Sequence, residues 1–294
     1  MLFEGSGVAI VTPFKEDGSV DYEAYEALID FHIDNNTDAI IACGTTAEAT
    51  CLSEEEKLRL IDISVKKIDG RIPLIVGTGS NNTYESARFS KKVSSIDGVD
   101  GLLVITPYYN KANKEGLYRH FETIAKNSSK DIILYNVPSR TNVNIDLDTL
   151  KRLAKIENIV GIKDATADLD YTISIRKEKE IPEDFAIYSG NDNLIVPIMS
   201  VGGNGVISVL ANIIPREVHN LINLCLEERY KEASRFQAKY YDLISALFNE
   251  VNPVGVKYGL SKIKLCNNVL RLPLTPASQE TESLIDKALE EIND

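Results

Sequence analysis

Eight short apolar runs recur along the chain, separated by longer amphipathic stretches. The runs are GVAIV (7–11), AIIAC (39–43), PLIVG (73–77), GLLVI (101–105), IILYN (132–136), IVGIK (159–163), FAIYS (185–189) and GVISV (205–209). Continuous apolar runs are typical of strands buried on both faces, and helical segments between them favour a parallel sheet. Eight such units predict an α/β fold, a closed (β/α)8 TIM barrel, although a doubly wound open sheet shares much of this pattern.

The connecting segments carry apolar residues at helical spacing, as at Leu58, Ile61 and Val65. Ser53 followed by Glu56 forms a capping box, which predicts the start of a helix. Beyond the eighth unit the sequence has only helical patterns, broken by prolines. We therefore expect a barrel catalytic domain over residues 1–225 and a C-terminal helical subdomain over residues 226–294.

Charge and cysteine content indicate which partners and which cellular location to expect. The 44 acidic and 32 basic side chains give a net charge of −12, which repels phosphate backbones and anionic membranes, so neither nucleic acid nor a membrane is an expected partner. Cys43, Cys51, Cys225 and Cys266 show no CxxC spacing and are expected to be reduced thiols. Because the sequence shows no basic leader and no apolar run near the roughly 20 residues of a membrane span, a cytoplasmic location is expected.

Lys163 is the most informative residue at a predicted strand end, where the active site of such a barrel lies. A lysine among apolar neighbours loses hydration, which lowers its pKa to as little as about 5–6 in extreme cases. The neutral amine is a nucleophile that condenses with a carbonyl to form a Schiff base. The alternative is a structural ion pair with Asp164 or another carboxylate, and position alone leaves both readings open.

Other polar residues follow neighbouring runs. Tyr135 ends the fifth run, so its phenol can exchange protons with atoms attached to Lys163, or simply pack. Thr45 and Thr46 follow Gly44 and offer hydroxyl and amide groups to a small carboxylate, or serve the turn itself. Arg140 has the geometry to bind a second carboxylate, or is merely solvated.

Metal, thiol and nucleotide chemistry are less well supported. His32, His120 and His219 fall in helical segments without zincin spacing, so we expect no metal site. Cys43 has no histidine at a strand end to activate it and reads as a buried thiol. The glycine-bearing segment GTGSNNT lacks the GxGxxG pattern, and no cofactor is expected.

Seven segments, in this order, resemble the dihydrodipicolinate synthase family of pyruvate-dependent class I aldolases over essentially the whole chain. They are GTTAEAT (44–50), GTGSNNT (77–83), TPYYNK (106–111), YNVPSRT (135–141), GIKDAT (161–166), YSGND (188–192) and GGNGVISVLAN (202–212). The resemblance implies a barrel with a helical C-terminal extension that condenses pyruvate with L-aspartate 4-semialdehyde on the route to diaminopimelate and lysine. It also implies a homotetramer built as a pair of tight dimers.

Residue by residue, the resemblance assigns roles to eight positions. Lys163 matches the Schiff-base lysine. The proton-relay positions match Tyr135, Thr45 and Tyr109, the last belonging to the site of a neighbouring subunit. The pyruvate-site positions match Thr46, Gly190 and Ile207, the latter two through backbone groups, and the position that receives the semialdehyde carboxylate matches Arg140.

Two positions depart from the family pattern. Ala47 replaces a glycine, so the turn after the threonines must tolerate a Cβ. Lys57 replaces a histidine of the lysine-inhibited relatives, whereas Asn81, Glu85 and Tyr108 match their inhibitor positions. A fixed cation repels a lysine ligand's ammonium, so we expect weak or no inhibition by L-lysine.

Two other functions are consistent with part of this sequence pattern. An N-acetylneuraminate lyase or a 2-keto-3-deoxy sugar acid aldolase of the same family would share the lysine and the tyrosine, although Arg140 and the TPYYN segment favour the synthase. A catalytically silent barrel with a binding role would have lost site residues, yet each matched position holds a competent one.

Overall fold

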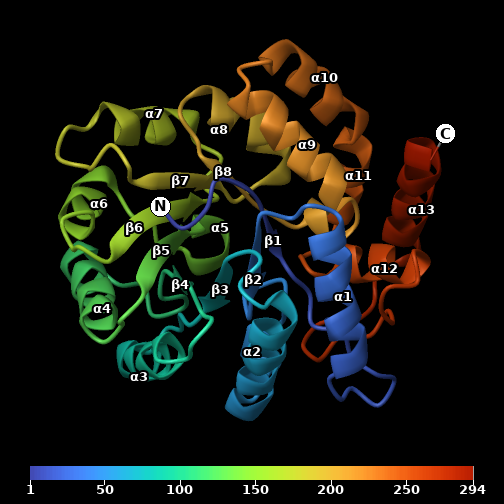
Figure 1. The fold of residues 1–294 in the computed structure, drawn as a ribbon, viewed down its shortest axis with the longest axis horizontal. Helices are drawn as coiled ribbons and strands as arrows, with labels where there is room; N and C mark the ends of the chain where they lie inside the picture. Colours follow the sequence, from blue (N-terminus) through green and yellow to red (C-terminus); the bar gives the residue numbers. More distant parts are fainter. Residues whose placement is uncertain (294) are drawn as a thin grey trace.

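Each of the eight apolar runs forms a strand in the computed structural model of the chain, which describes residues 1–293. All neighbouring strands are parallel and follow chain order, and β1 pairs with β8 to close the barrel (Figure 1). The predicted (β/α)8 barrel is therefore confirmed, and the open sheet is excluded. The strands are β1 Gly5–Ala9, β2 Ala39–Ala42, β3 Leu74–Gly77, β4 Gly101–Ile105, β5 Asp131–Asn136, β6 Ile159–Asp164, β7 Ala186–Ser189 and β8 Gly205–Ser208.

The first strand begins two residues before the position predicted from the sequence. The prediction began at Gly7, whereas β1 spans Gly5–Ala9. A Cβ at Gly7 would lie 2.7 Å from the Ile41 side chain and 2.8 Å from the Phe3 ring. Gly7 therefore serves close packing inside the barrel and does not form a turn.

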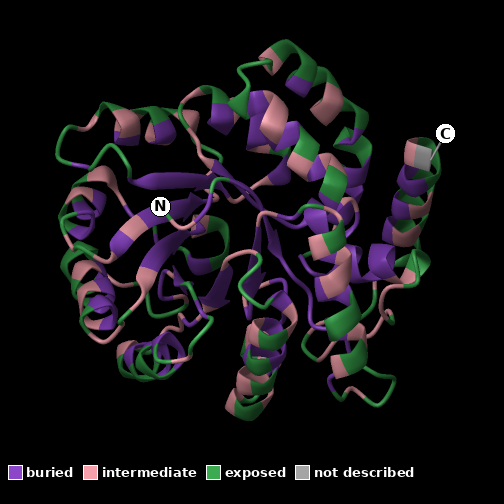
Figure 2. Cartoon of the chain, in the orientation of Figure 1, coloured by how far each residue is buried: buried purple, intermediate pink, exposed green. Residues whose placement is uncertain are grey.

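Helices follow the strands and cover the outside of the barrel, with their buried faces turned inward (Figure 2). The capping box at Ser53 and Glu56 is present at the start of α2, as predicted. Within residues 1–293 no helix is both long and apolar enough to cross a membrane. The helices of the barrel part are α1 Tyr22–Asp34, α2 Glu54–Ile68, α3 Thr83–Ser94, α4 Lys114–Lys126, α5 Pro138–Thr141, α6 Leu147–Leu153, α7 Leu169–Lys177, α8 Ile195–Ser200 and α9 Pro215–Leu226, with short 3-10 helices η1 Ala49–Cys51, η2 Asp192–Leu194 and η3 Leu210–Asn212.

Side chains alternate between the barrel interior and the helical layer along each strand. On β5, Ile133 and Tyr135 belong to the interior cluster, whereas Ile132 and Leu134 pack with the helices. Phe3 and Tyr188 stack with ring centroids 4.4 Å apart, and the Tyr188 hydroxyl donates to the Phe3 carbonyl at 2.6 Å. This pair fills the interior near the start of β1, so the opposite mouth is the end left for a ligand.

The chain beyond α9 is helical, as predicted. Its helices are α10 Tyr230–Lys239, α11 Tyr241–Leu247, α12 Val254–Lys262 and α13 Gln279–Asn293. The first of them packs on α8 and α9, while α11 and α12 contact η3 after β8 (Figure 1). We keep the division into a barrel domain, 1–225, and a helical subdomain, 226–294, as a proposal; Asp294 lies outside the described residues.

Candidate active site

Lys163 points into the barrel near the carboxyl end of β6. Its neighbour Ile162 packs with the helical layer, so alternation turns Lys163 inward. The residue is only 5% exposed. It lines a cavity of about 160 Å³ with five other residues that the sequence assigned to the site, namely Thr45, Thr46, Tyr135, Arg140 and Gly190. The fold thus brings together six of the eight predicted positions.

The Lys163 amine is buried without a close counter-ion. Among residues 1–293, no carboxylate oxygen lies within 4.0 Å of its Nζ. Burial lowers the pKa of Lys163 from 10.5 to about 8; the Asp192 charge opposes this shift and the Arg140 charge adds to it. A substantial fraction of the amine is therefore neutral near pH 8, as a nucleophile requires.

Asp164 does not pair with Lys163, so that part of the ion-pair alternative is wrong. Adjacent residues on a strand face opposite sides, and the Asp164 carboxylate lies on the side of the helices. There it accepts hydrogen bonds from the Thr166 hydroxyl at 2.6 Å and the Asn136 amide at 3.3 Å. Burial raises the pKa of Asp164 to about 6.

Tyr135 is the direct neighbour of Lys163 across the sheet. The two residues are register partners on β5 and β6, and the lysine Nζ lies 4.4 Å from the centroid of the phenol ring. Burial raises the pKa of Tyr135, while the Arg140 charge and the nearby Thr45 hydroxyl oppose that rise. The phenol therefore stays protonated at neutral pH and has a hydroxyl partner for passing a proton.

The turn after β2 carries Thr45 and Thr46 and accommodates the unusual alanine. Two residues of the turn are left-handed, Cys43 with φ of 55° and Glu48 with φ of 52°, and Ala47 does not have a positive φ. Ala47 is buried, and its carbonyl accepts from the Thr12 hydroxyl at 2.8 Å. The expectation that the turn tolerates a Cβ is confirmed, because the backbone strain falls one residue later.

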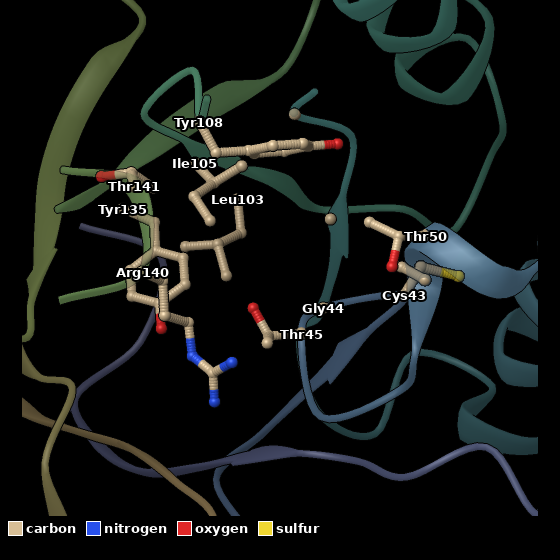
Figure 3. A pocket seen from close by; sticks show the side chains of 13 residues that line it. Cys43, Gly44, Thr45, Thr50, Leu103, Ile105, Tyr108, Tyr135, Arg140 and Thr141 are labelled. Carbon is tan, nitrogen blue, oxygen red and sulfur yellow. The ribbon is translucent and has the colours of Figure 1, made fainter. Parts of the chain in front are cut away.

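Arg140 and Thr45 also border a larger cavity of about 250 Å³ that shares Gly44, Leu103 and Tyr135 with the first. Figure 3 shows the Thr45 hydroxyl and the Arg140 guanidinium directed into the same space, with Tyr108 on its far wall. Arg140 stands on α5, directly after β5, and its Nη2 donates to the Asn252 carbonyl at 3.0 Å. The exposed guanidinium is free to meet a carboxylate that enters from solvent.

Of the two residues predicted to contact pyruvate through backbone groups, Gly190 lines the cavity and Ile207 does not. Gly190 lines the Lys163 cavity, and its N–H donates to the Asp164 carbonyl at 2.7 Å, which leaves its own carbonyl as the backbone group available to a ligand. A Cβ at Gly190 would meet the Ala165 side chain at 2.7 Å, so this close approach requires glycine. Ile207 lies on β8 with its side chain in the interior cluster and does not line the cavity.

Tyr109 lies away from the Lys163 cavity. Its side chain is 90% exposed, its φ is 74°, and it borders a shallow pocket with Asn81 and Asn110. A large aromatic side chain held outward on a strained backbone serves no packing role within this chain. The position is compatible with a role at the surface of a second subunit.

The sequence did not single out two further residues of the site. Asp192 is buried, and its carboxylate accepts from the Ser208 hydroxyl at 2.5 Å and from the N–H groups of Val209 and Leu210. Asn252 lines the cavity, and its side-chain amide donates to the Thr46 hydroxyl at 3.0 Å. Asp192 stood at a predicted strand end within YSGND, whereas Asn252 is 206 residues from its partner and gave no local signal.

The three histidines lie on helices, whereas Cys43 borders the larger cavity. His32, His120 and His219 are on α1, α4 and α9, so their helical placement is confirmed. No three His, Cys, Asp or Glu side chains in the described part of the chain are grouped as a metal site. Burial raises the pKa of Cys43 to about 12, which leaves it a protonated thiol at neutral pH.

Comparison with known proteins gives a consistent picture. The sequence model of the Dihydrodipicolinate synthetase family matches residues 2–292. The 4-hydroxy-tetrahydrodipicolinate synthase of Alkaliphilus oremlandii is 48% identical over 278 residues, 95% of this chain and 94% of the relative. The crystal structure of dihydrodipicolinate synthase from Aquifex aeolicus matches with a TM-score of 0.96 and 44% identity, over 99% of this chain and 98% of that one.

A second similar structure contains a bound ligand. It is a chloride-inhibited dihydrodipicolinate synthase from Acinetobacter baumannii complexed with pyruvate, with a TM-score of 0.95, 40% identity and 99% coverage of both chains. Family model, sequence relatives and solved structures all span nearly the full length. The chain therefore belongs to the Dihydrodipicolinate synthetase family.

Proposed function

We propose that this protein is a 4-hydroxy-tetrahydrodipicolinate synthase, a lyase that condenses pyruvate with L-aspartate 4-semialdehyde through a Schiff base on Lys163. The observation that carries this proposal is the buried amine without a counter-ion at the barrel mouth. Relatives at up to 48% identity are named for the same activity. Such a synthase serves the diaminopimelate and lysine pathway.

The first half of the reaction joins pyruvate to the enzyme. The neutral Lys163 amine adds to the carbonyl carbon of pyruvate, and loss of water gives an imine. Tyr135, which shares the cavity with the Thr45 hydroxyl, hands a proton to the departing hydroxyl and later accepts one. We assign the pyruvate carboxylate to the Thr46 hydroxyl, and we assign the Gly190 carbonyl, which can only accept a hydrogen bond, to the hydroxyl that departs. The imine draws electrons from the pyruvate methyl group, whose deprotonation gives an enamine, so the reaction needs no separate cofactor.

The second half forms the carbon–carbon bond. The enamine carbon attacks the aldehyde carbon of the semialdehyde, whose carboxylate we place on the exposed guanidinium of Arg140. The semialdehyde amino group then closes the ring on the imine carbon, and Lys163 leaves as the free amine. Borohydride reduction with pyruvate tests the core of this scheme, because it fixes the imine as a stable secondary amine on Lys163.

We infer further that the working unit is a homotetramer built from two tight dimers, in which Tyr109 of each subunit completes the proton relay of its neighbour. The outward-facing Tyr109 supports this arrangement. Sedimentation of the wild type and of Tyr109→Phe tests it. We expect both to be tetramers and Tyr109→Phe to be slow; a monomer that is fully active would contradict the inference.

The sugar-acid alternative within the family has less support. The curated relatives are named 4-hydroxy-tetrahydrodipicolinate synthase at 42% to 48% identity. Release of pyruvate from N-acetylneuraminate, measured beside the condensation reaction, separates the two activities. We expect no release above background.

A further inference from the structure

A second lysine, Lys257 on α12, is buried more deeply than Lys163 but is fully paired. Lys257 is 0% exposed, and its Nζ lies 2.6 Å from Glu48 Oε1, 2.8 Å from the Val269 carbonyl and 3.8 Å from the centroid of the Phe14 ring. An isolated buried charge is strongly unfavourable, so the two charges of this ion pair depend on each other. The pair joins the C-terminal subdomain to the barrel.

Glu48 belongs to the turn that presents the site threonines. Its N–H donates to the Thr45 carbonyl at 3.0 Å, and its own backbone is left-handed. Its second carboxylate oxygen accepts from the Arg271 N–H at 2.9 Å. A non-glycine residue keeps this conformation only where its surroundings fix it, and here both carboxylate oxygens are held by the C-terminal subdomain.

The same subdomain also reaches the turn near its middle. The Asn252 side-chain amide donates to the Thr46 hydroxyl, and the Asn252 carbonyl accepts from Arg140. Asn252 directly precedes Pro253 and α12, the helix that carries Lys257. Residues from one C-terminal segment therefore contact the turn at Thr46 and at Glu48.

We propose that the segment from Asn252 to Arg271 is a positioning element, which acts through the Lys257–Glu48 ion pair to hold the turn that places the Thr45 hydroxyl in the cavity it shares with Tyr135. Lys257 and Glu48 touch neither the cavity nor the substrate; they are positioning residues and act through Thr45. The proposal rests on the function above, because Thr45 matters only if protons pass through Tyr135. It predicts that the ion pair governs the rate of proton transfer, while the imine still forms to its full extent at equilibrium.

The main test variant is the double substitution Glu48→Gln/Lys257→Met. Removing both charges avoids the unpaired buried carboxylate that Lys257→Met alone would leave, so the double variant is expected to fold with a Tm near that of the wild type. We expect kcat to fall at least tenfold, while the fraction of Lys163 trapped by borohydride with pyruvate stays at the wild-type level. Lys262→Met is the matched control, since Lys262 lies on the same helix but pairs with Asp286 at the surface.

A double-mutant cycle with Thr45→Val separates positioning from general stability. If the ion pair acts through Thr45, adding Glu48→Gln/Lys257→Met to Thr45→Val lowers kcat no further. The proposal is overturned if the two losses multiply, if the double variant keeps kcat within twofold of wild type, or if trapping falls together with kcat. Failure of the wild type itself to trap pyruvate would instead refute the proposed function.

Discussion

Lys163 Nζ lies 4.4 Å from the centroid of the Tyr135 ring, on the strand next to its own. The parallel register of β5 and β6 sets this relationship, because the Cα atoms of the two residues are direct partners. An amine and a phenol so placed can share one bound molecule, the amine bonded to its carbon and the phenol serving its oxygen.

Tyr135→Phe should lower kcat by about 10² to 10⁴, the usual contribution of a positioned acid or base. The ring and its packing remain, so borohydride trapping of pyruvate should still reach completion, although more slowly. Tyr25→Phe is the control, because Tyr25 also has a buried hydroxyl, bonded to Ser64 and outside the site. Wild-type kcat in Tyr135→Phe would contradict the assigned role.

The acid limb of kcat/KM for pyruvate should follow the titration of Lys163. With its pKa near 8, the reactive neutral amine is lost tenfold per pH unit below that value. The Arg140 charge lowers the pKa of Lys163, so Arg140→Met should move the limb to higher pH. Arg152→Met, which removes a surface cation that pairs with Glu115, should leave the limb in place. An unmoved limb in Arg140→Met would show that a different group titrates.

Lys163→Met should stabilise the protein at pH 7. The folded pKa of about 8 lies below the value of 10.5 for an exposed lysine, so the unfolded chain binds more protons between these values and stability rises with pH across that window. At pH 7 the buried amine costs about 3 kcal/mol. Urea unfolding at pH 7 and pH 10 should show a gain for Lys163→Met at the lower pH that shrinks at the higher one. An equal gain at both would refute the pKa assignment.

Inhibition by L-lysine should be weak or absent. Lys57, Glu85 and Tyr108 line one cavity beside the active-site turn, together with Arg88, whereas Asn81 lies in the neighbouring pocket with Tyr109. The Lys57 ammonium would repel that of a bound lysine, so Lys57→Ala should bind L-lysine more tightly than the wild type. Initial rates across a lysine titration measure the inhibition of the wild type and of Lys57→Ala. Micromolar inhibition of the wild type would contradict the prediction.

The sequence predicts the barrel well because each strand is a continuous apolar run. The error at the start of β1 arises because tertiary packing sets where that strand begins. The predicted run began at Gly7, yet β1 begins at Gly5, and the close approach of Phe3 to Gly7 requires glycine within the strand. Lys163 and Tyr135 were found because both stand at strand ends, which a barrel brings together.

The sequence analysis did not identify residues that contact the site from distant parts of the chain. Asn252 and Lys257 reach Thr46 and Glu48 from the C-terminal subdomain, and no spacing rule links positions so far apart. Asp192 lies within a recognised segment, but only the fold shows that its charge acts on Lys163. Lys163 and Lys257 differ in their partners, which the sequence does not reveal.

The most direct measurement is intact and peptide mass after borohydride treatment with pyruvate, made on the wild type and on Lys163→Arg. We predict that the wild type gains one reduced pyruvate per chain, on the peptide that contains Lys163, and that Lys163→Arg gains none. Absence of added mass in the wild type, or its appearance at Lys257 or any other lysine, would contradict the central claim.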